Sequence, residues 1–185
     1  MKREEKNALS RQRILDAAMR EFSARGYEGA SLNTVCTEYG ISKGIIYHYF
    51  KDKDELYLLC TEKCFNEITA YLEETAKQLS GTVEQKLQTY FDARLCFFAN
   101  NPLYLGIFAD AALNPPEALS AEIAKCRKKF DELNISVLTG LLNSKPLREG
   151  LAVEAIVEDF RIYMDFFNLR FKTSFDGKST LETAL

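Results

Sequence analysis

Apolar residues recur three and four positions apart along nearly the whole chain, which is the spacing of amphipathic helices. The first helix should begin at a Ser10 cap and end near Gly26. Its apolar stripe consists of Ile14, Leu15, Ala18 and Phe22. Ser31 should cap a short second helix that Gly40 stops, and Ser42 should cap a third. No segment shows the alternation of a β-strand, so the pattern predicts an all-α fold.

The rest of the chain predicts five further helices. Asp52 and Glu55 form a D-x-x-E capping box at the start of the fourth helix. Asn114 precedes two prolines and a glutamate, which is a strong helix start with Asn114 as its cap. The tail after Phe175 should fray. The expected spans are about 53–79, about 83–100, a short segment from 102, about 115–142 and about 152–174.

Length and charge narrow the class of protein. The chain has 185 residues, which is enough for one sizeable domain or for a small module fused to a larger one. Its net charge is -3. Residues 1–57 hold 10 basic and 9 acidic side chains, whereas residues 58–185 hold 14 and 18. Between Gly40 and Lys53 the balance is locally positive, which suggests that this segment meets an anion. The absence of a signal-peptide core or of an apolar run near ~20 residues predicts a cytoplasmic protein without a membrane span.

The residues that carry most enzyme and metal chemistry are scarce. His48 is the single histidine, and a zinc site needs about four ligands. No dinucleotide fingerprint, P-loop or HExxH pattern occurs. We therefore predict no catalytic residue, no metal and no cofactor. The five cysteines contain no CxxC pair and should be small buried hydrophobes, although Cys60 and Cys64, one helical turn apart, leave redox sensing open.

The first three helices match a helix-turn-helix head. In the turn between the second and third helices, Gly40 supplies a left-handed cap and Ile41 fills the gap between them. The third helix should pack through Ile45, Ile46 and either Tyr49 or Phe50. Its exposed positions should be Lys43, Gly44, Tyr47 and His48.

Two strings in this head make the match specific. The segment GISKGIIYHYFKDKDEL, residues 40–56, resembles the recognition-helix signature of the TetR family of transcriptional regulators, and ILDAAMREFSARGY, residues 14–27, resembles that family's first helix. The resemblance covers the first 57 residues closely and the rest in architecture only. It implies a helix-turn-helix domain in residues 1–52 and a larger helical effector-binding and dimerisation domain in residues 53–185.

The resemblance also implies a function. The protein should be a repressor that binds a palindromic double-stranded DNA operator as a homodimer and is released by a small-molecule effector. Lysines supply charge to backbone phosphates, while tyrosine offers contacts to base edges. Arg11 and Arg13 receive no assignment, and Phe50 belongs to the core. The expected DNA contacts are Thr34, Ser42, Lys43, Gly44, Tyr47, His48, Tyr49, Lys51 and Lys53.

The body offers an interface and an effector region. The two long C-terminal helices have apolar faces wide enough to close a symmetric four-helix interface, unless both are simply buried in a monomer. Arg94 lies on an aromatic helix face and either pairs with a carboxylate such as Asp110, the favoured reading, or awaits an anionic ligand. The expected interface residues are Phe130, Val137, Leu141, Phe160, Tyr163, Phe167 and Phe171. The expected effector-binding residues are Tyr90, Arg94, Phe98, Tyr104, Phe108 and Asp110.

Two alternatives from other classes stay open. The chain is then either an all-α enzyme that uses carboxylates in the aromatic region, or a helical ligand-binding protein. In both alternatives the three-helix head is structural and has no affinity for DNA.

Overall fold

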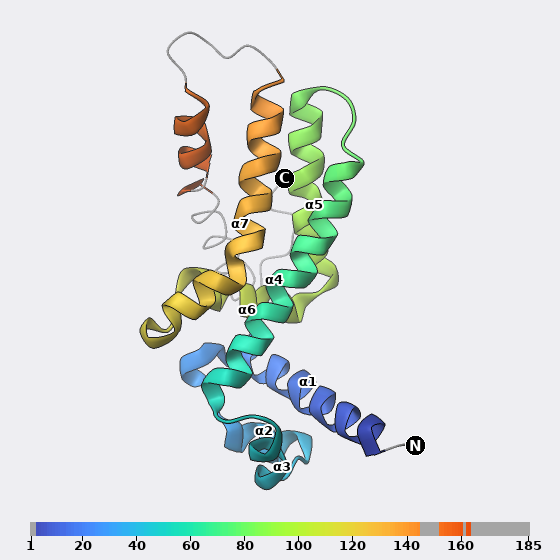
Figure 1. Cartoon of the computed structure of the whole chain (residues 1–185), viewed down its shortest axis with the longest axis vertical. Coiled ribbons are helices and arrows are strands. Elements are labelled where there is room, and N and C mark those ends of the chain that lie inside the picture. Colours follow the sequence, from blue (N-terminus) through green and yellow to red (C-terminus); the bar gives the residue numbers. More distant parts are fainter. Residues whose placement is uncertain (1–2, 145–151, 161, 164–185) are drawn as a thin grey trace. The chain divides into compact units, whose positions relative to one another are not determined.

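The structure, a computed structural model, describes residues 3–144, 152–160 and 162–163 (Figure 1). Within these ranges all regular structure is helical, which confirms the all-α prediction. Residues 153–160 and 162–163 belong to the predicted last helix, while the rest of that helix and the tail lie outside the described residues. The named elements are α1 Arg3–Gly29, α2 Leu32–Tyr39, α3 Lys43–Tyr49, α4 Lys53–Lys77, α5 Val83–Asn100, α6 Pro102–Leu113, the 3-10 turn η1 Glu117–Leu119 and α7 Ser120–Leu142.

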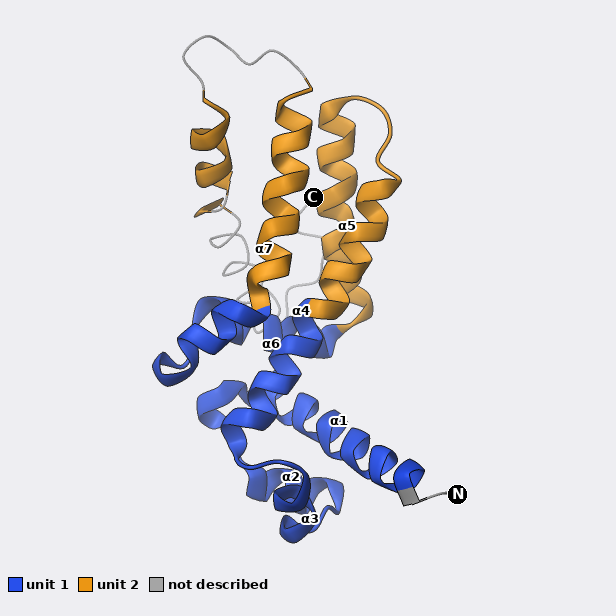
Figure 2. Ribbon diagram, viewed as in Figure 1, with its two compact units in different colours: residues 1–65, 102–126 blue, residues 66–101, 127–185 orange. Residues whose placement is uncertain are grey.

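The chain divides into two compact units, coloured separately in Figure 2. Unit 1 comprises residues 1–65 and 102–126, so it holds α1 to α3, the first half of α4, α6 and the start of α7. Unit 2 comprises residues 66–101 and 127–185. Below, "the head" means residues 3–52, which form α1, α2 and α3 within unit 1.

Helix α1 begins earlier than predicted, so the Ser10 cap is wrong. It starts at Arg3 because the segment before Ser10 consists largely of good helix formers, and Glu4 and Glu5 lie in the first turn, where negative charge is favourable. The helical path breaks at Gly26, as predicted, with φ 64° and ψ -178°, but helical residues resume and reach Gly29.

The break at Gly26 is held by α6. The freed N–H of Tyr27 donates to the carboxylate of Asp110 at 2.8 Å. A Cβ on Gly26 would lie 2.5 Å from Asp110 Oδ1, so glycine is needed here for space as well as for its positive φ. Farther along the pair, α1 packs against α6, and a Cβ on Gly106 would overlap the backbone carbonyl oxygen of Ser23. The two helices therefore approach to backbone contact.

The predicted helix start at Asn114 is also wrong. Pro116 has extended backbone angles, φ -54° and ψ 128°, and it is followed by the 3-10 turn η1 rather than by an α-helix. The reason is that a residue before proline avoids the α region, so Pro115 cannot open a helix in front of Pro116. Helix α7 begins at Ser120, whose hydroxyl donates to the Pro116 carbonyl at 3.1 Å.

Unit 2 is built around α5. Thr82 caps this helix in a capping box with Gln85, and its bounds agree with the prediction. Tyr71 of α4 packs against Phe97 of α5, with ring centroids 5.4 Å apart. Phe91 of α5 packs against Phe160 in the same way. Aromatic rings therefore supply much of the contact between the helices of this unit.

Candidate nucleic-acid interface

Local signals set the bounds of α2 and α3. The Ser31 hydroxyl accepts from the N–H of Asn33 at 3.1 Å, and the Ser42 hydroxyl accepts from the N–H of Ile45 at 3.3 Å. Gly40 ends α2 in the left-handed conformation, with φ 61° and ψ 40°. These three caps are confirmed, because each depends on residues within one turn of the chain.

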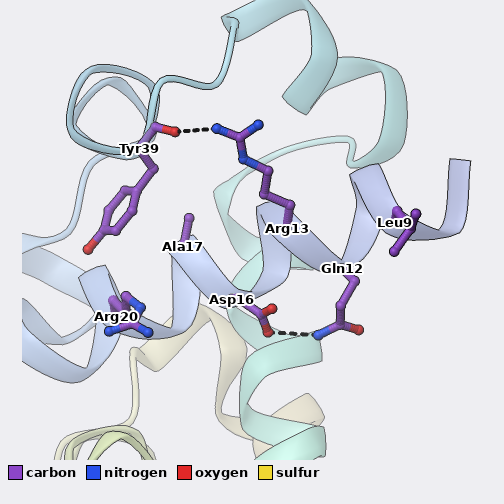
Figure 3. Close-up of a pocket in the computed structure, with 7 residues that line it drawn as sticks. All are labelled: Leu9, Gln12, Arg13, Asp16, Ala17, Arg20 and Tyr39. Atoms are coloured by element: carbon purple, nitrogen blue, oxygen red, sulfur yellow. Dashed lines mark hydrogen bonds between the residues drawn. The ribbon is translucent and has the colours of Figure 1, made fainter. Parts of the chain in front are cut away.

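The turn between α2 and α3 is fixed to α1. Ile41 is buried in the turn, and Val35, Ile46 and Phe50 are buried around it. Figure 3 shows the guanidinium of Arg13, on α1, reaching across to α2, where it donates to the carbonyl oxygen of Tyr39 at 3.0 Å. Apolar packing and this hydrogen bond together hold α3 in one orientation on the head.

Helix α3 turns a continuous face to solvent. Ile46 is fully buried, whereas Tyr47 is 49% exposed and Ile45 is 47% exposed. The prediction that Ile45 packs inward is wrong. Ile45 and Ile46 differ in direction by about 100° around the helix, and the orientation of α3 places Ile46 in the core and Ile45 on the flank. We call Lys43, Gly44, Ile45, Tyr47 and His48, all exposed, the outer face of α3.

Three lysines lie on or just after α3. The ammonium of Lys43 is 5.9 Å from the ring centroid of Tyr47. The Lys51 side chain is 85% exposed and its ammonium is 3.5 Å from the Asp52 carboxylate, an exposed ion pair that contributes little stability. The ammonium of Lys53 lies over the Tyr27 ring, 4.3 Å from its centroid. Lys43 and Lys51 thus present their charge to solvent, while Lys53 is partly covered.

Two hydrogen bonds order the chain around Lys51, just before α4. The N–H of Glu55 donates to the Asp52 carboxylate at 2.9 Å, which keeps the pKa of Asp52 below its ordinary value. In return Glu55 accepts from the N–H of Lys51 at 2.6 Å. The predicted capping box between Asp52 and Glu55 is therefore present, except that the Glu55 side chain accepts from the N–H of Lys51 and not from that of Asp52.

The other expected contact residues have partners inside the head. The Tyr49 hydroxyl donates to the Asn7 side chain at 3.1 Å, and its ring meets the His48 ring edge-on with centroids 4.8 Å apart. Thr34 is half-buried in the first turn of α2. The Ser42 hydroxyl accepts the capping hydrogen bond described above, which leaves its own proton available to donate.

A surface pocket of about 510 Å³ lies beside the turn (Figure 3). Six of its residues come from α1 and one from α2. Its wall carries both signs of charge, from Arg13 and Arg20 and from Asp16, to which Gln12 donates at 2.7 Å. Arg11 lies over the Phe50 ring at 5.2 Å. The lining residues are Leu9, Gln12, Arg13, Asp16, Ala17, Arg20 and Tyr39.

Three of the expected effector residues lie in unit 2. Arg94 is 5% exposed, and its guanidinium carbon lies 5.2 Å from the centroid of the Phe130 ring. The Tyr90 hydroxyl donates to the Asn134 side chain at 3.3 Å, and burial raises the pKa of Tyr90 to about 12. Phe98 is buried on the same helix. A buried guanidinium over a ring, next to a buried phenol, is a polar cluster in an aromatic setting.

The other three expected effector residues lie in unit 1, where Tyr104 and Phe108 contact α4 and Asp110 contacts both α4 and the head. The Tyr104 carbonyl accepts from the Cys64 thiol at 3.4 Å, and the Phe108 ring packs against Phe65. Asp110 accepts from the Tyr57 hydroxyl at 2.7 Å in addition to the N–H of Tyr27. The partners of Asp110 were not predicted, and the pairing of Arg94 with Asp110 stays a prediction.

The expected interface residues differ in exposure. Phe130 and Leu141 are buried, Val137 and Phe160 are half-buried, and Tyr163 is exposed. Phe167 and Phe171 lie outside the described residues.

Cys60 and Cys64 are fully buried, and burial raises the pKa of both thiols. A protonated, inaccessible thiol reacts slowly with oxidants, which argues against redox sensing here. Within the described part of the chain, no group of three or more His, Cys, Asp or Glu side chains is placed to hold a metal ion. In the same residues we find no helix with the length and apolarity that a membrane crossing requires.

Comparison with known proteins agrees with this geometry. Residues 14–60 match the family model of bacterial regulatory proteins of the tetR family. The negative transcriptional regulator IcaR of the biofilm operon of Staphylococcus epidermidis is 24% identical over 170 residues, 90% of this chain and 85% of that protein. The transcriptional repressor AcnR of Corynebacterium efficiens is 39% identical over 80 residues, 43% of this chain and 40% of that protein.

The fold has a solved counterpart. The regulator FadR of Bacillus subtilis, in complex with stearoyl-CoA, superimposes with a TM-score of 0.73 at 20% identity, covering 91% of this chain and 89% of that one. The relatives described here are regulators and not enzymes. The helix-turn-helix head and the family match lead to one assignment: residues 14–60 form the DNA-binding domain of a TetR-family transcriptional regulator, and the helical body that follows has the fold of FadR.

Proposed function

We propose that this regulator is a repressor that binds a palindromic DNA operator as a homodimer and leaves it when a small molecule binds. Residues 1–52 bind DNA, and residues 53–185 bind the effector and form the dimer. The observation that carries the proposal is the outer face of α3. It is exposed and flanked by lysines on a helix whose opposite side is fixed to the head.

Each candidate contact has a role that its position supports. Lys43 and Lys51 neutralise phosphates, and Lys53 does so from beside Tyr27. Tyr47 meets base edges, His48 meets a phosphate beside it, and Gly44 lets the backbone of α3 come close to the bases. A further set binds or orients the backbone of the DNA from the edge of the interface. This set comprises Thr34, Ser42 and Tyr49.

The relatives support the sign of regulation and a class of effector. IcaR is a negative regulator and AcnR is a repressor, which favours repression by this chain. Because FadR binds stearoyl-CoA, fatty acyl-CoA thioesters are the first effectors to test. We propose that the effector contacts Tyr90, Arg94 and Phe98 of α5 in unit 2, while the predicted roles of Tyr104, Phe108 and Asp110 of unit 1 stay predictions. An anionic ligand would suit the buried guanidinium of Arg94.

The dimer is proposed to form through α7 and the helix that begins at residue 153. Tyr163 is exposed there, and Val137 and Phe160 are half-buried, so apolar surface remains for a partner. Val137→Glu should then give monomers in light scattering. A dimer that persists in this variant would place the interface elsewhere.

The test of the function is a binding experiment. Fluorescence anisotropy of labelled DNA from upstream of the chain's own gene should show a specific complex. Lys43→Ala and Tyr47→Ala should weaken it at least tenfold, while Lys77→Ala, an exposed lysine in unit 2, should not. Tyr47→Phe, which keeps the ring, separates the ring from the hydroxyl. Equal binding by all four variants and wild type would refute the proposal.

A further inference from the structure

Ile45 exposes apolar surface on α3, where the core is filled by its neighbour Ile46. Among the described residues of the head, the exposed large hydrophobic side chains are Leu9, Ile45 and Tyr47. Two of these three lie on the outer face of α3. The backbone N–H of Ile45 caps onto Ser42, but its side chain is 47% exposed and contributes little to the core.

The helical phase shows how Ile45 is presented. With Ile46 pointing to the core, Gly44 and His48 point directly away from it, and Ile45 and Tyr47 lie on the two flanks, each about 100° from Ile46. Gly44 has no side chain, and apart from its chain neighbours and the backbone of its own helix no described atom lies within 4 Å of a Cβ built there. At Gly44, one turn before His48, the centre of the face therefore carries no side chain between the aliphatic flank of Ile45 and the aromatic flank of Tyr47.

The chemistry of Ile45 restricts what it can recognise. An isoleucine side chain neither donates nor accepts hydrogen bonds, so it cannot distinguish the polar edges of guanine, adenine or cytosine. The apolar feature that a base pair shows in the major groove is the 5-methyl group of thymine. Lys43 on the same helix and Lys51 just beyond it favour a polyanion over an apolar protein partner.

We propose that Ile45 is a specificity-determining residue that packs against a thymine methyl group in each half of the operator. This inference rests on the proposed DNA-binding function and adds to it the base chemistry that one flank of α3 reads. It differs from the expected role of Tyr47, which contacts base edges through both a ring and a hydroxyl.

The experiment removes single methyl groups from the DNA. An operator sequence is selected from random DNA with the wild-type protein, and each thymine is then replaced in turn by deoxyuridine, which keeps every hydrogen bond. Burial of one methyl group corresponds to about fourfold in affinity. At one or two thymines per half-site, uracil should therefore weaken wild-type binding about fourfold, or about 15-fold when both half-sites are changed.

Ile45 variants then assign the effect to this side chain. Ile45→Ala should bind the thymine operator more weakly and show no further loss with uracil at those positions, while other thymines behave as in wild type. Ile45→Val, which keeps a branched apolar side chain, should retain most of the response. The uracil series with wild-type protein needs no variant, so it remains decisive if a substitution disturbs folding.

The outcomes separate this inference from the proposed function. A specific complex that is indifferent to uracil at every thymine overturns the inference and leaves the proposed function intact. The same holds if Ile45→Ala responds to uracil as strongly as wild type. If no sequence is selected and no specific complex forms, the proposed function fails and the inference falls with it.

Discussion

Replacing Gly44 with alanine should stabilise the free protein and weaken its complex with DNA. Gly44 is exposed near the start of α3, and its φ is not positive. Within the part of the chain that the structure describes, no atom beyond its chain neighbours and the backbone of its own helix comes within 4 Å of the Cβ that alanine would add. The fold therefore gives no reason for glycine at this position.

The two effects have separate magnitudes. Alanine in place of a helical glycine raises the free energy of unfolding by about 0.5–1 kcal/mol. For a protein of this size that is an increase of about 1–4 °C in Tm. Against DNA, the same methyl group lies at the centre of the outer face of α3. Extra atoms in a packed interface cost about 1–3 kcal/mol, which weakens binding about fivefold to 150-fold.

The assay pairs a thermal melt of the free protein with an anisotropy titration of the operator. Gly140→Ala is the matched control, since Gly140 is also an exposed helical glycine and no described atom surrounds its Cβ position. It should raise Tm similarly, and because Gly140 lies on α7, the proposed dimer helix, it is a control for stability alone. The reasoning is refuted if Gly44→Ala binds the operator as wild type does, or if it lowers Tm.

Three further predictions follow from buried groups. Asp110→Ala leaves the Tyr57 hydroxyl and the Tyr27 N–H without their acceptor, so the free energy of unfolding measured in urea should fall by about 2–4 kcal/mol. A decrease below about 1 kcal/mol would contradict the role of this carboxylate. Arg94→Met removes a buried charge from beside the Phe130 ring. If this leaves a carboxylate partner of Arg94 buried without its counter-charge, the free energy of unfolding should fall by about 3–5 kcal/mol, and an unchanged or higher Tm would exclude that pair. In thiol labelling of the native protein, the exposed Cys96 should react first, while Cys60 and Cys64 should react only when the protein unfolds. Rapid labelling of either buried thiol would contradict its burial and its raised pKa.

The parts of the fold that follow from neighbouring residues were predictable. Ser31, Gly40 and Ser42 each act within one turn of the chain, and the structure places all three as expected. Ser10 failed as a cap because the residues before it already favour a helix. The Asn114 start failed because two adjacent prolines restrict the backbone more than a cap favours a helix.

The parts that depend on distant contacts or on helical phase were not predictable in the same way. Asp110 lies 83 residues from Tyr27 and 53 from Tyr57, and no local pattern connects them. Ile45 and Ile46 are alike in sequence, and only the orientation that Arg13 and the core impose on α3 decides which of them is buried. The residue that the sequence assigned to packing is thus the one available for recognition.

The most direct test of the central claim, that the outer face of α3 and its lysines bind DNA, is the salt dependence of operator binding. Lys43, Lys51 and Lys53 in two subunits would neutralise about six phosphates, each contributing about -0.9 to the slope of log K against log salt. We predict a slope between about -5 and -7, and a slope shallower by about two in Lys51→Ala. A flat salt curve, or an unchanged slope in Lys51→Ala, would contradict the claim.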